Sequence, residues 1–490
     1  MMGTTPILPG FHPDPSICRA GGDYYLINSS FEYFPGVPIF TSTDLLTWRQ
    51  IGNVLDRESQ LNVSPGLSGA GKGIYAPTIR FHDGRFWMTT TNITDVAEGH
   101  LVVHAQDPAG PWSEPVYTSG VIGWDPDLFW DEEGHCHLTW ADPRGGIAHA
   151  LIDPLSGRLL SKTELIWQGT GLSSPEGPHL FRKNGWWYLL VAEGGTGRGH
   201  AVTIGRARSV TGPYEAHPEG PILTHRSTSH PVQNTGHADM VELKDGTWAM
   251  VYLGVRPRGE FPRFHVNGRE TFLAAVDWTG DWPAVVPDQY QEPQPATSFI
   301  DDFTGTELHP RWISPGVPPA SFCRSDTNGG VTLDAGRSPE EKEAKRLLAV
   351  RTRDAQWQVN VKAPAGNLAL ILRIDDSHWT GIERHGDVVS ARAVIGPMDQ
   401  ILASATGIPL TAPLALRTME SPQQHGVRTG PDRVELGYEQ DGFKLLATLD
   451  GRYLSTEVAG GFTGRVIGVE ALGREARISR FEYLATATGA

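Results

Sequence analysis

The chain has 490 residues, enough for more than one domain, and its 39% hydrophobic and 20% charged residues are the balance of an ordinary soluble protein. Its net charge of −15 disfavours nucleic acids and anionic membranes as partners, because both bind basic surfaces. Three cysteines do not make a disulfide framework. The N-terminus has no signal-peptide pattern and no stretch approaches the roughly 18 apolar residues of a membrane span, so we expect a cytoplasmic protein.

A short phrase recurs five times in the first 290 residues, and the residue at its head changes from copy to copy. Each copy continues into a turn and an aromatic, β-rich run, and turns such as Asp83-Gly84 and Asn184-Gly185 are strong hairpin signals. A hairpin-bearing unit every 50 to 60 residues, roughly, predicts a five-bladed β-propeller. The phrases are residues 14–17 (DPSI), 76–79 (APTI), 125–128 (DPDL), 176–180 (EGPHL) and 237–240 (HADM).

The heads of the five phrases are candidate site residues. The innermost strands of a propeller surround its axis, so their heads converge at one mouth of the central channel. Three heads are carboxylates: Asp14, Asp125 and Glu176. A single Asp before Pro is more often a turn residue, but three acids in register across repeats favour a functional site.

The rest of the chain predicts a linker and a second β domain. Residues 287–297 are rich in Pro and Gln and have little to bury, so we place a linker at 291–298. Beyond it, short segments such as 356–361 and 367–373 alternate apolar and polar residues, which predicts a jelly-roll-like antiparallel β-sandwich. A short helix is predicted over 340–348. The expected chain is all-β, with a propeller over 1–290 and a sandwich over 299–490.

Three acids at one channel mouth suit the hydrolysis of a glycosidic bond with inversion. One carboxylate stays ionised and activates water, while the other stays protonated and donates to the leaving oxygen; a gap of about 6.5–9.5 Å between them holds the water. A third ionised group nearby raises the pKa of the acid by like-charge repulsion.

Residues 5–290 resemble the family 43 glycoside hydrolases, the inverting β-xylosidases and α-L-arabinofuranosidases. Residues 299–490 are similar to the β-sandwich of the xylosidase-like branch, so the resemblance covers nearly the whole chain. In such relatives a sandwich loop helps to close the pocket, and the sequence does not identify that loop. The motifs are residues 10–16 (GFHPDPS), 29–36 (SSFEYFPG), 74–80 (IYAPTIR), 176–179 (EGPH), 193–196 (EGGT), 235–239 (TGHAD) and 268–273 (GRETFL).

The resemblance implies a role for each acid. Asp14 is then the general base, Glu176 the general acid, and Asp125 the residue that orients this acid and tunes its pKa. Asp127 rivals Asp125, because alternation aims both at one face of a strand, but the family places the acid directly before Pro, as at Asp125. Glu193 is the next candidate acid should Glu176 not serve.

Two further residues match the family at the channel. Arg269 corresponds to an arginine that can bind sugar hydroxyls and hold the base ionised. His237 would lie at the axis, where it could bind a metal such as calcium, or a water cluster. One histidine without clustered ligands is weak support for a metal, so no cofactor is required. The side chains of residues 135–137 (HCH) alternate between faces of a strand, so we interpret them as structural.

Phe31, Tyr75 and Trp124 adjoin the site motifs and are candidate substrate-binding residues. Aromatic rings pack against the apolar faces of sugars, and core packing is the alternative for each. Many family members have Trp where this chain has Tyr75, which leaves the preferred sugar open.

The sequence therefore predicts an exo-acting, inverting glycosidase that removes terminal xylose or arabinofuranose from plant cell-wall oligosaccharides such as xylo-oligosaccharides. One alternative is a non-catalytic carbohydrate-binding propeller, which needs the aromatic residues but not three acids. The other is a fructan-active propeller hydrolase, whose Arg-Asp-Pro motif does not occur in this chain. The expected partner is an oligosaccharide, and the resemblance leaves a homo-oligomer open.

Overall fold

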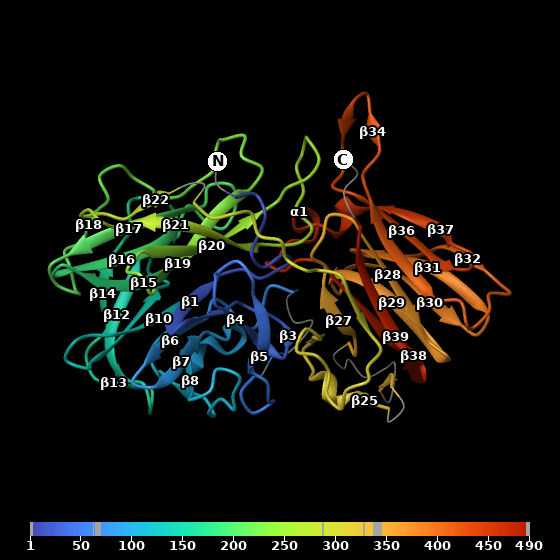
Figure 1. Cartoon of the computed structure of the whole chain (residues 1–490), viewed down its shortest axis with the longest axis horizontal. Coiled ribbons are helices and arrows are strands. Elements are labelled where there is room, and N and C mark those ends of the chain that lie inside the picture. Colours follow the sequence, from blue (N-terminus) through green and yellow to red (C-terminus); the bar gives the residue numbers. More distant parts are fainter. Residues whose placement is uncertain are drawn as a thin grey trace.

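The computed structural model describes residues 3–61, 63, 70–286, 289–326, 329–336 and 345–486. It is almost entirely β-structure, arranged as two bodies side by side: a propeller from the N-terminal half and a sandwich from the C-terminal half (Figure 1). The fold class predicted from the sequence is confirmed.

Within the described residues the propeller consists of five antiparallel sheets, each made from one continuous stretch of the chain, which we number blades one to five. Blade one contains β1 (Ser16–Ala20), β2 (Asp23–Ile27), β4 (Gly36–Ser42) and β5 (Arg49–Leu55), and blade two contains β6 (Thr78–His82), β7 (Arg85–Thr90), β8 (Leu101–Ala105) and β9 (Val116–Tyr117). Blade three contains β10 (Trp124–Trp130), β11 (Cys136–Ala141) and β12 (Ile147–Asp153), with β13 (Arg158–Leu159) and β14 (Glu164–Trp167) on β12. Blade four contains β15 (Glu176–Lys183), β16 (Trp186–Glu193), β17 (Ala201–Ala207) and β18 (Glu215–Ala216), and blade five contains β19 (Gln233–Glu242), β20 (Trp248–Val255), β21 (Glu270–Asp277) and β22 (Ala284–Val286).

The hairpin turns form where the sequence predicts them. Asp83 and Gly84 join β6 to β7 with φ of 47° and 72°, and Asn184 and Gly185 join β15 to β16 with φ of 51° and 75°. Two successive residues with positive φ are what a tight two-residue hairpin loop requires, and Asn, Asp and Gly adopt that conformation at the least cost.

The blades close into a ring around the first strand of each sheet. The inner strands β1, β6, β10, β15 and β19 contact one another in that order, and β19 contacts β1. Asp239 of β19 accepts hydrogen bonds from Ser16 Oγ (2.7 Å) and Ile17 N (3.1 Å) of β1. Blade five is thereby joined to blade one, and the ring is closed.

The hydrophobic core of the propeller is divided between neighbouring blades. Five clusters of buried apolar side chains among the described residues each span one pair of adjacent blades, in the order one–two, two–three, three–four, four–five and five–one. Middle strands are therefore buried on both faces, which explains continuous apolar runs such as 186–192 (WWYLLVA).

The sandwich packs two antiparallel sheets around one apolar core. The first sheet has the order β23 (Phe299–Asp301), β39 (Arg480–Ala485), β28 (Trp357–Lys362), β33 (Leu414–Met419), β36 (Arg433–Glu439) and β37 (Phe443–Asp450). The second has the order β25 (Cys323–Ser325), β26 (Val331–Asp334), β38 (Val466–Ile478), β29 (Ala365–Asp375), β30 (His378–His385), β31 (Val388–Ile395) and β32 (Met398–Ala405), with β27 (Leu348–Arg351) also on β38.

Helical structure is sparse in the described part of the chain. Besides the α-helix α1 (Thr456–Ala459) there are short 3₁₀ turns at Ile93–Glu98, Pro319–Ser321 and Gly451–Leu454, and no described helix has the length and apolar character to cross a bilayer. Of the short helix predicted over 340–348, residues 340–344 lie outside the described residues. The remainder is wrong, because residues 345–347 are irregular and Leu348 begins β27.

The two bodies share a buried interface. Strand β24 (Ser314–Pro315), which precedes the sandwich sheets, pairs with β3 (Tyr33–Phe34) of the propeller. Arg373 of the sandwich, fully buried, donates to Glu32 Oε1 (2.8 Å) and to the hydroxyl of Tyr33 (3.0 Å). One apolar cluster draws on both bodies, from Phe11 to Val466. These contacts fix the sandwich segment around α1, which lies between the two bodies in Figure 1, against the propeller.

Candidate active site

A pocket of about 420 Å³ lies at the mouth of the propeller, and we call it the mouth pocket. All five phrase heads line it, including Ala76 of blade two. The eight site residues predicted from the sequence all line it as well: Asp14, Phe31, Tyr75, Trp124, Asp125, Glu176, His237 and Arg269. Five further lining residues were not singled out from the sequence: Ile93, Ser174, Gly195, Thr196 and Phe462.

Three of the five phrase heads share an unusual backbone conformation. Asp14, Asp125 and His237 have φ of 53°, 55° and 45°, and Gly177, directly after Glu176, has φ of 55°. Left-handed φ costs a non-glycine residue free energy and is concentrated at functional sites. At Gly177 a side chain would also be obstructed, because a Cβ there would lie 2.8 Å from His237 Nε2.

Bulges at the heads separate Asp125 from Asp127. The pairing of β10 with β11 shifts register between Trp124 and Asp127, and equivalent shifts follow Glu176 in blade four and Gly236 in blade five. A bulge breaks the strict alternation of faces along a strand. Asp125 therefore lines the mouth pocket, while Asp127 is fully buried below it.

Asp14 is held as a carboxylate. It is 5% exposed, and its oxygens accept hydrogen bonds from Ser29 Oγ (2.5 Å) and Arg269 Nη1 (2.9 Å). Burial by itself raises the pKa of Asp14, but the Arg269 guanidinium, His237 and the Ser29 hydroxyl together bring the pKa below its ordinary value. Arg269 also donates to Thr196 Oγ1 (3.0 Å), which fixes the guanidinium beside Asp14.

The surroundings of Glu176 and Asp125 favour the protonated form of each carboxyl group. Burial, followed by the charge of Asp14, raises the pKa of Glu176 to about 7. Burial, followed by the charges of Glu176 and Asp14, raises the pKa of Asp125 well above its ordinary value. Asp125 Oδ2 accepts a hydrogen bond from Gly177 N (3.3 Å), so it contacts the backbone directly after Glu176. The pocket thus contains an ionised carboxylate and a neighbouring pair that retains a proton near neutral pH.

Glu193 belongs to a different environment. It is fully buried, and its carboxylate accepts hydrogen bonds from Thr170 N (3.0 Å), Thr170 Oγ1 (2.8 Å) and Thr203 Oγ1 (2.5 Å). It does not line the mouth pocket. Its contacts anchor the connection between blades three and four, so Glu193 is unsuited to act as an acid in place of Glu176.

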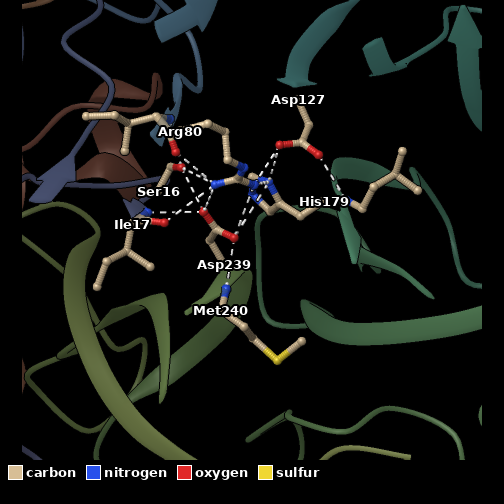
Figure 2. Close-up of polar contacts among 9 residues, drawn as sticks. Ser16, Ile17, Arg80, Asp127, His179, Asp239 and Met240 are labelled. Atoms are coloured by element: carbon tan, nitrogen blue, oxygen red, sulfur yellow. Dashed lines mark hydrogen bonds and ion pairs between the residues drawn. The ribbon is translucent and has the colours of Figure 1, made fainter. Parts of the chain in front are cut away.

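A network of charged and polar side chains fills the channel beneath the pocket, and Figure 2 shows it. Each blade contributes one residue: Ser16, Arg80, Asp127, His179 and Asp239. Arg80 forms ion pairs with Asp127 (2.6 Å) and Asp239 (2.7 Å), and its Nη2 lies 2.8 Å from His179 Nδ1. This axial network lies on the inner strands just after the heads and ties the blades together beneath the acids.

Aromatic rings from both bodies form one wall of the pocket. Phe31, Tyr75 and Phe462 lie with their ring centroids about 6 Å apart (5.9, 6.0 and 6.0 Å), and the guanidinium carbon of Arg269 is 5.4 Å from the centroid of Phe462. Phe462 follows α1 and two glycines in the sandwich. The loop that carries Phe462 is the sandwich loop that closes the pocket, which the sequence did not identify. In the sequence this loop is marked only by an aromatic residue in a glycine-rich connection.

Among the described residues, His237 is not part of a cluster of three side-chain ligand atoms close enough to hold one ion. Its Nδ1 lies 3.7 Å from Asp14 Oδ1, and burial lowers its pKa to about 4, which keeps the ring neutral. Among the described residues, the cluster of three side-chain ligand atoms within reach of one ion is Asp131, Glu133 and His135, on the surface of blade three. Calcium prefers six to eight oxygen ligands, so the side chains around His237 do not fit that ion by themselves.

The three residues of the His-Cys-His triplet lie in different environments: one is exposed and two are buried. His135 is exposed beside Asp131, Cys136 packs in the core between blades two and three, and His137 Nδ1 lies 2.9 Å from His149 Nε2. These placements agree with the structural interpretation.

Comparisons with known proteins identify the family. Residues 3–283 match the model described as glycosyl hydrolases family 43, and residues 300–484 match the beta xylosidase C-terminal concanavalin A-like domain. The chain therefore belongs to glycoside hydrolase family 43.

Similar proteins include enzymes of two named specificities. The non-reducing end alpha-L-arabinofuranosidase BoGH43B of Bacteroides ovatus is 34% identical over 96% of this chain and 91% of that protein. A xylosidase/arabinosidase of Butyrivibrio fibrisolvens is 45% identical over 59% of this chain, and the match spans 57% of that protein. Among solved structures, a Bacteroides ovatus xyloglucan-locus GH43B superposes with a TM-score of 0.86 at 32% identity, covering 98% of this chain and 99% of that one. A xylan beta-1,4-xylosidase of Bacillus halodurans superposes with a TM-score of 0.84 at 30% identity, covering 99% and 100%.

Proposed function

We propose that the protein is an inverting exo-glycosidase that releases terminal xylose or arabinofuranose from plant cell-wall oligosaccharides such as xylo-oligosaccharides. One observation carries the proposal: three carboxyl groups from blades one, three and four line one pocket, and their surroundings lower the pKa of Asp14 but raise those of Glu176 and Asp125. Titratable groups whose pKa values are driven apart indicate an acid and a base.

In the proposed mechanism Asp14 accepts a proton from the attacking water. Arg269 and Ser29 keep Asp14 ionised and fix its orientation. Glu176, with a pKa of about 7, donates its proton to the oxygen of the leaving group. Asp125 accepts a hydrogen bond from Gly177 N, directly after Glu176, and the charge of Glu176 raises the pKa of Asp125, so we assign Asp125 as a positioning residue for the acid. Water attacks from the face opposite the leaving group, so the anomeric configuration inverts.

The aromatic wall supports a terminal sugar as the substrate. Phe31 and Tyr75 offer apolar surface to a pentose ring, and Phe462 from the sandwich closes the pocket beside them. A pocket closed by a second domain admits the end of a chain rather than its middle. The similar enzymes include proteins named as xylosidases and one named as an arabinofuranosidase, which supports both pentoses as candidates.

Two measurements test the proposal. Rates on 4-nitrophenyl β-D-xylopyranoside and 4-nitrophenyl α-L-arabinofuranoside, with sucrose alongside, should show pentosidase activity and identify the preferred sugar. Proton NMR of the first-formed sugar should show the anomer opposite to that of the substrate. Early appearance of the retained anomer, or transfer of the sugar to added methanol, would contradict the mechanism, and inactivity on both pentosides would contradict the function.

A further inference from the structure

A second cavity, of about 650 Å³, adjoins the mouth pocket. The two share Thr196, Arg269 and Phe462 as lining residues. The remaining walls come from loops of blades four and five and from the sandwich segment around α1. A molecule that extends from the mouth pocket past these three residues therefore enters the second cavity.

The second cavity carries uncompensated positive charge. Arg198 and Arg263 both line it, and neither side chain has a hydrogen bond, an ion pair or a ring contact with any described residue. The one acidic residue in the lining, Glu457, is engaged by His265, whose Nδ1 lies 2.6 Å from Glu457 Oε1 and whose backbone N–H donates to Oε2 (3.0 Å). Arg269 is neutralised by Asp14. Two free guanidinium groups thus face one cavity in a chain whose net charge is −15.

The surroundings of this cavity suit a sugar. Its polar lining includes Ser227, Thr228 and Asn234. Phe261, next in sequence to the lining residue Pro262, is 90% exposed, and its ring makes no aromatic or cation–π contact with another described residue. An exposed ring offers a face for the C–H groups of a sugar, while hydroxyl and amide groups bind its oxygens.

We propose that Arg198 and Arg263 bind the carboxylate of a uronic acid in the same oligosaccharide whose terminal pentose occupies the mouth pocket. This inference rests on the proposed function. A guanidinium group matches a carboxylate in shape and charge, and it forms two parallel hydrogen bonds that are stronger than neutral ones. The natural substrate is then an acidic oligosaccharide, with the uronic acid attached close to the pentose that is removed.

Two oligosaccharides that differ in one group test the proposal. The first carries a glucuronic acid on the sugar next to the terminal pentose. In the second, the carboxyl of that glucuronic acid has been reduced to the alcohol. The wild-type enzyme should have a kcat/KM at least about tenfold higher on the acidic oligosaccharide, the effect of one charge-assisted hydrogen bond. The ratio should fall as NaCl is raised, because salt screens the attraction. A wild-type ratio near one overturns the proposal without any variant.

Variants then assign the effect to the two arginines. The double substitution Arg198→Gln and Arg263→Gln should bring the ratio of the two kcat/KM values to about one, and the corresponding double Lys variant should restore part of it. Arg49→Gln, which removes an exposed arginine from β5 of blade one, is the matched control and should keep the wild-type ratio. A ratio that survives the double Gln substitution would place the carboxylate elsewhere and reject the assignment.

A binding measurement separates this inference from the proposed function. Calorimetric titration of the two oligosaccharides into the Asp14→Asn variant measures the affinity of each one in the absence of turnover. Tighter binding of the acidic oligosaccharide supports the cavity assignment even if neither pentoside is cleaved, an outcome that would reject the hydrolase mechanism alone. Equal binding together with normal pentosidase activity rejects the cavity assignment alone.

Discussion

Three carboxyl groups in one pocket differ in charge because their neighbours differ. Asp14 accepts hydrogen bonds from a guanidinium and a hydroxyl, which outweigh the cost of burying its charge. Glu176 has no cation at hydrogen-bond distance among the described residues, so burial and the charge of Asp14 dominate and raise its pKa to about 7. A carboxyl group thus favours its ionised or its protonated form according to what surrounds it.

The first prediction contrasts the acid with the base by changing the leaving group. Glu176→Ala should nearly abolish cleavage of a pentose disaccharide, whose alkoxide needs a proton, but keep substantial activity on a dinitrophenyl pentoside, whose phenolate leaves without one. Asp14→Ala should lose at least about 10²-fold on both substrates, because water needs a base whatever is leaving. Steady-state rates on the two substrates check this. Equal losses for Glu176→Ala on both would reject it as the acid.

The second prediction concerns the pH dependence of kcat/KM. The acid must be protonated, so the rate should fall as pH rises through about 7, the pKa of Glu176, and it should fall at low pH only below the depressed pKa of Asp14. The charge of Glu176 raises the pKa of Asp125, and this repulsion is reciprocal, so Asp125→Asn should move the basic limb to lower pH. A basic limb that stays in place would show that Asp125 does not tune the acid.

Asp127→Asn is the matched comparison for that experiment, because Asp127 lies two residues away in the axial network and not in the pocket. Its main effect should be on stability, with the position of the basic limb unchanged.

At the scale of a single element, four of the five inner strands have a candidate site residue at the head, blade two having Ala76 there, and all five carry a residue of the axial network below it. The bulge or left-handed residue at the head turns one side chain into the mouth pocket. Further along the strand, the next inward side chain joins the axial network. The strain at the heads is tolerated because the network and the blade cores hold the strands below.

The third prediction tests the axial network. Arg80→Met leaves Asp127 and Asp239 buried without their common partner, which should cost about 3–5 kcal/mol of unfolding free energy. Arg80→Lys should lose less, because it keeps the charge. Urea denaturation measures both. Arg85→Met, on the neighbouring strand β7, is the control and should stay within about 0.5 kcal/mol of wild type. A loss below about 1 kcal/mol for Arg80→Met would show that the two carboxylates do not depend on Arg80.

At the scale of the whole molecule, the sandwich completes the site. The buried Arg373–Glu32 pair, the β3–β24 pairing and the shared apolar cluster fix the sandwich on the propeller. That contact brings Phe462 to Phe31, more than 400 residues earlier in the chain, and forms the partition between the two cavities.

The fourth prediction measures this contribution of the sandwich. Phe462→Ala removes one ring of the aromatic wall, and kcat/KM on a pentoside should fall by about tenfold or more, the equivalent of ~1.5 kcal/mol of aromatic packing. Phe443→Ala, on β37 of the sandwich and outside the pocket, is the control. Wild-type kcat/KM in Phe462→Ala would show that the sugar does not use this wall.

The sequence by itself determined the features that repeat along the chain. Hairpin turns, apolar middle strands and phrase heads are local patterns, so five copies predict five blades and bring Asp14, Asp125, Glu176 and His237 to one mouth. Arg269, Phe31, Tyr75 and Trp124 followed from motifs beside those heads, and the structure places all of them around the same pocket.

Only the tertiary structure decided the features that depend on contacts between distant segments. Alternation could not separate Asp125 from Asp127, because the bulge that separates them is a property of the pairing between β10 and β11. Glu193 was a plausible acid until Thr170 and Thr203 were seen to occupy its carboxylate. Phe462 carries no periodic signal, and neither do Arg198 and Arg263, the two arginines of the second cavity that are unpaired among the described residues. Their surroundings come from loops of different blades and from the second domain, and no local pattern encodes which loops meet.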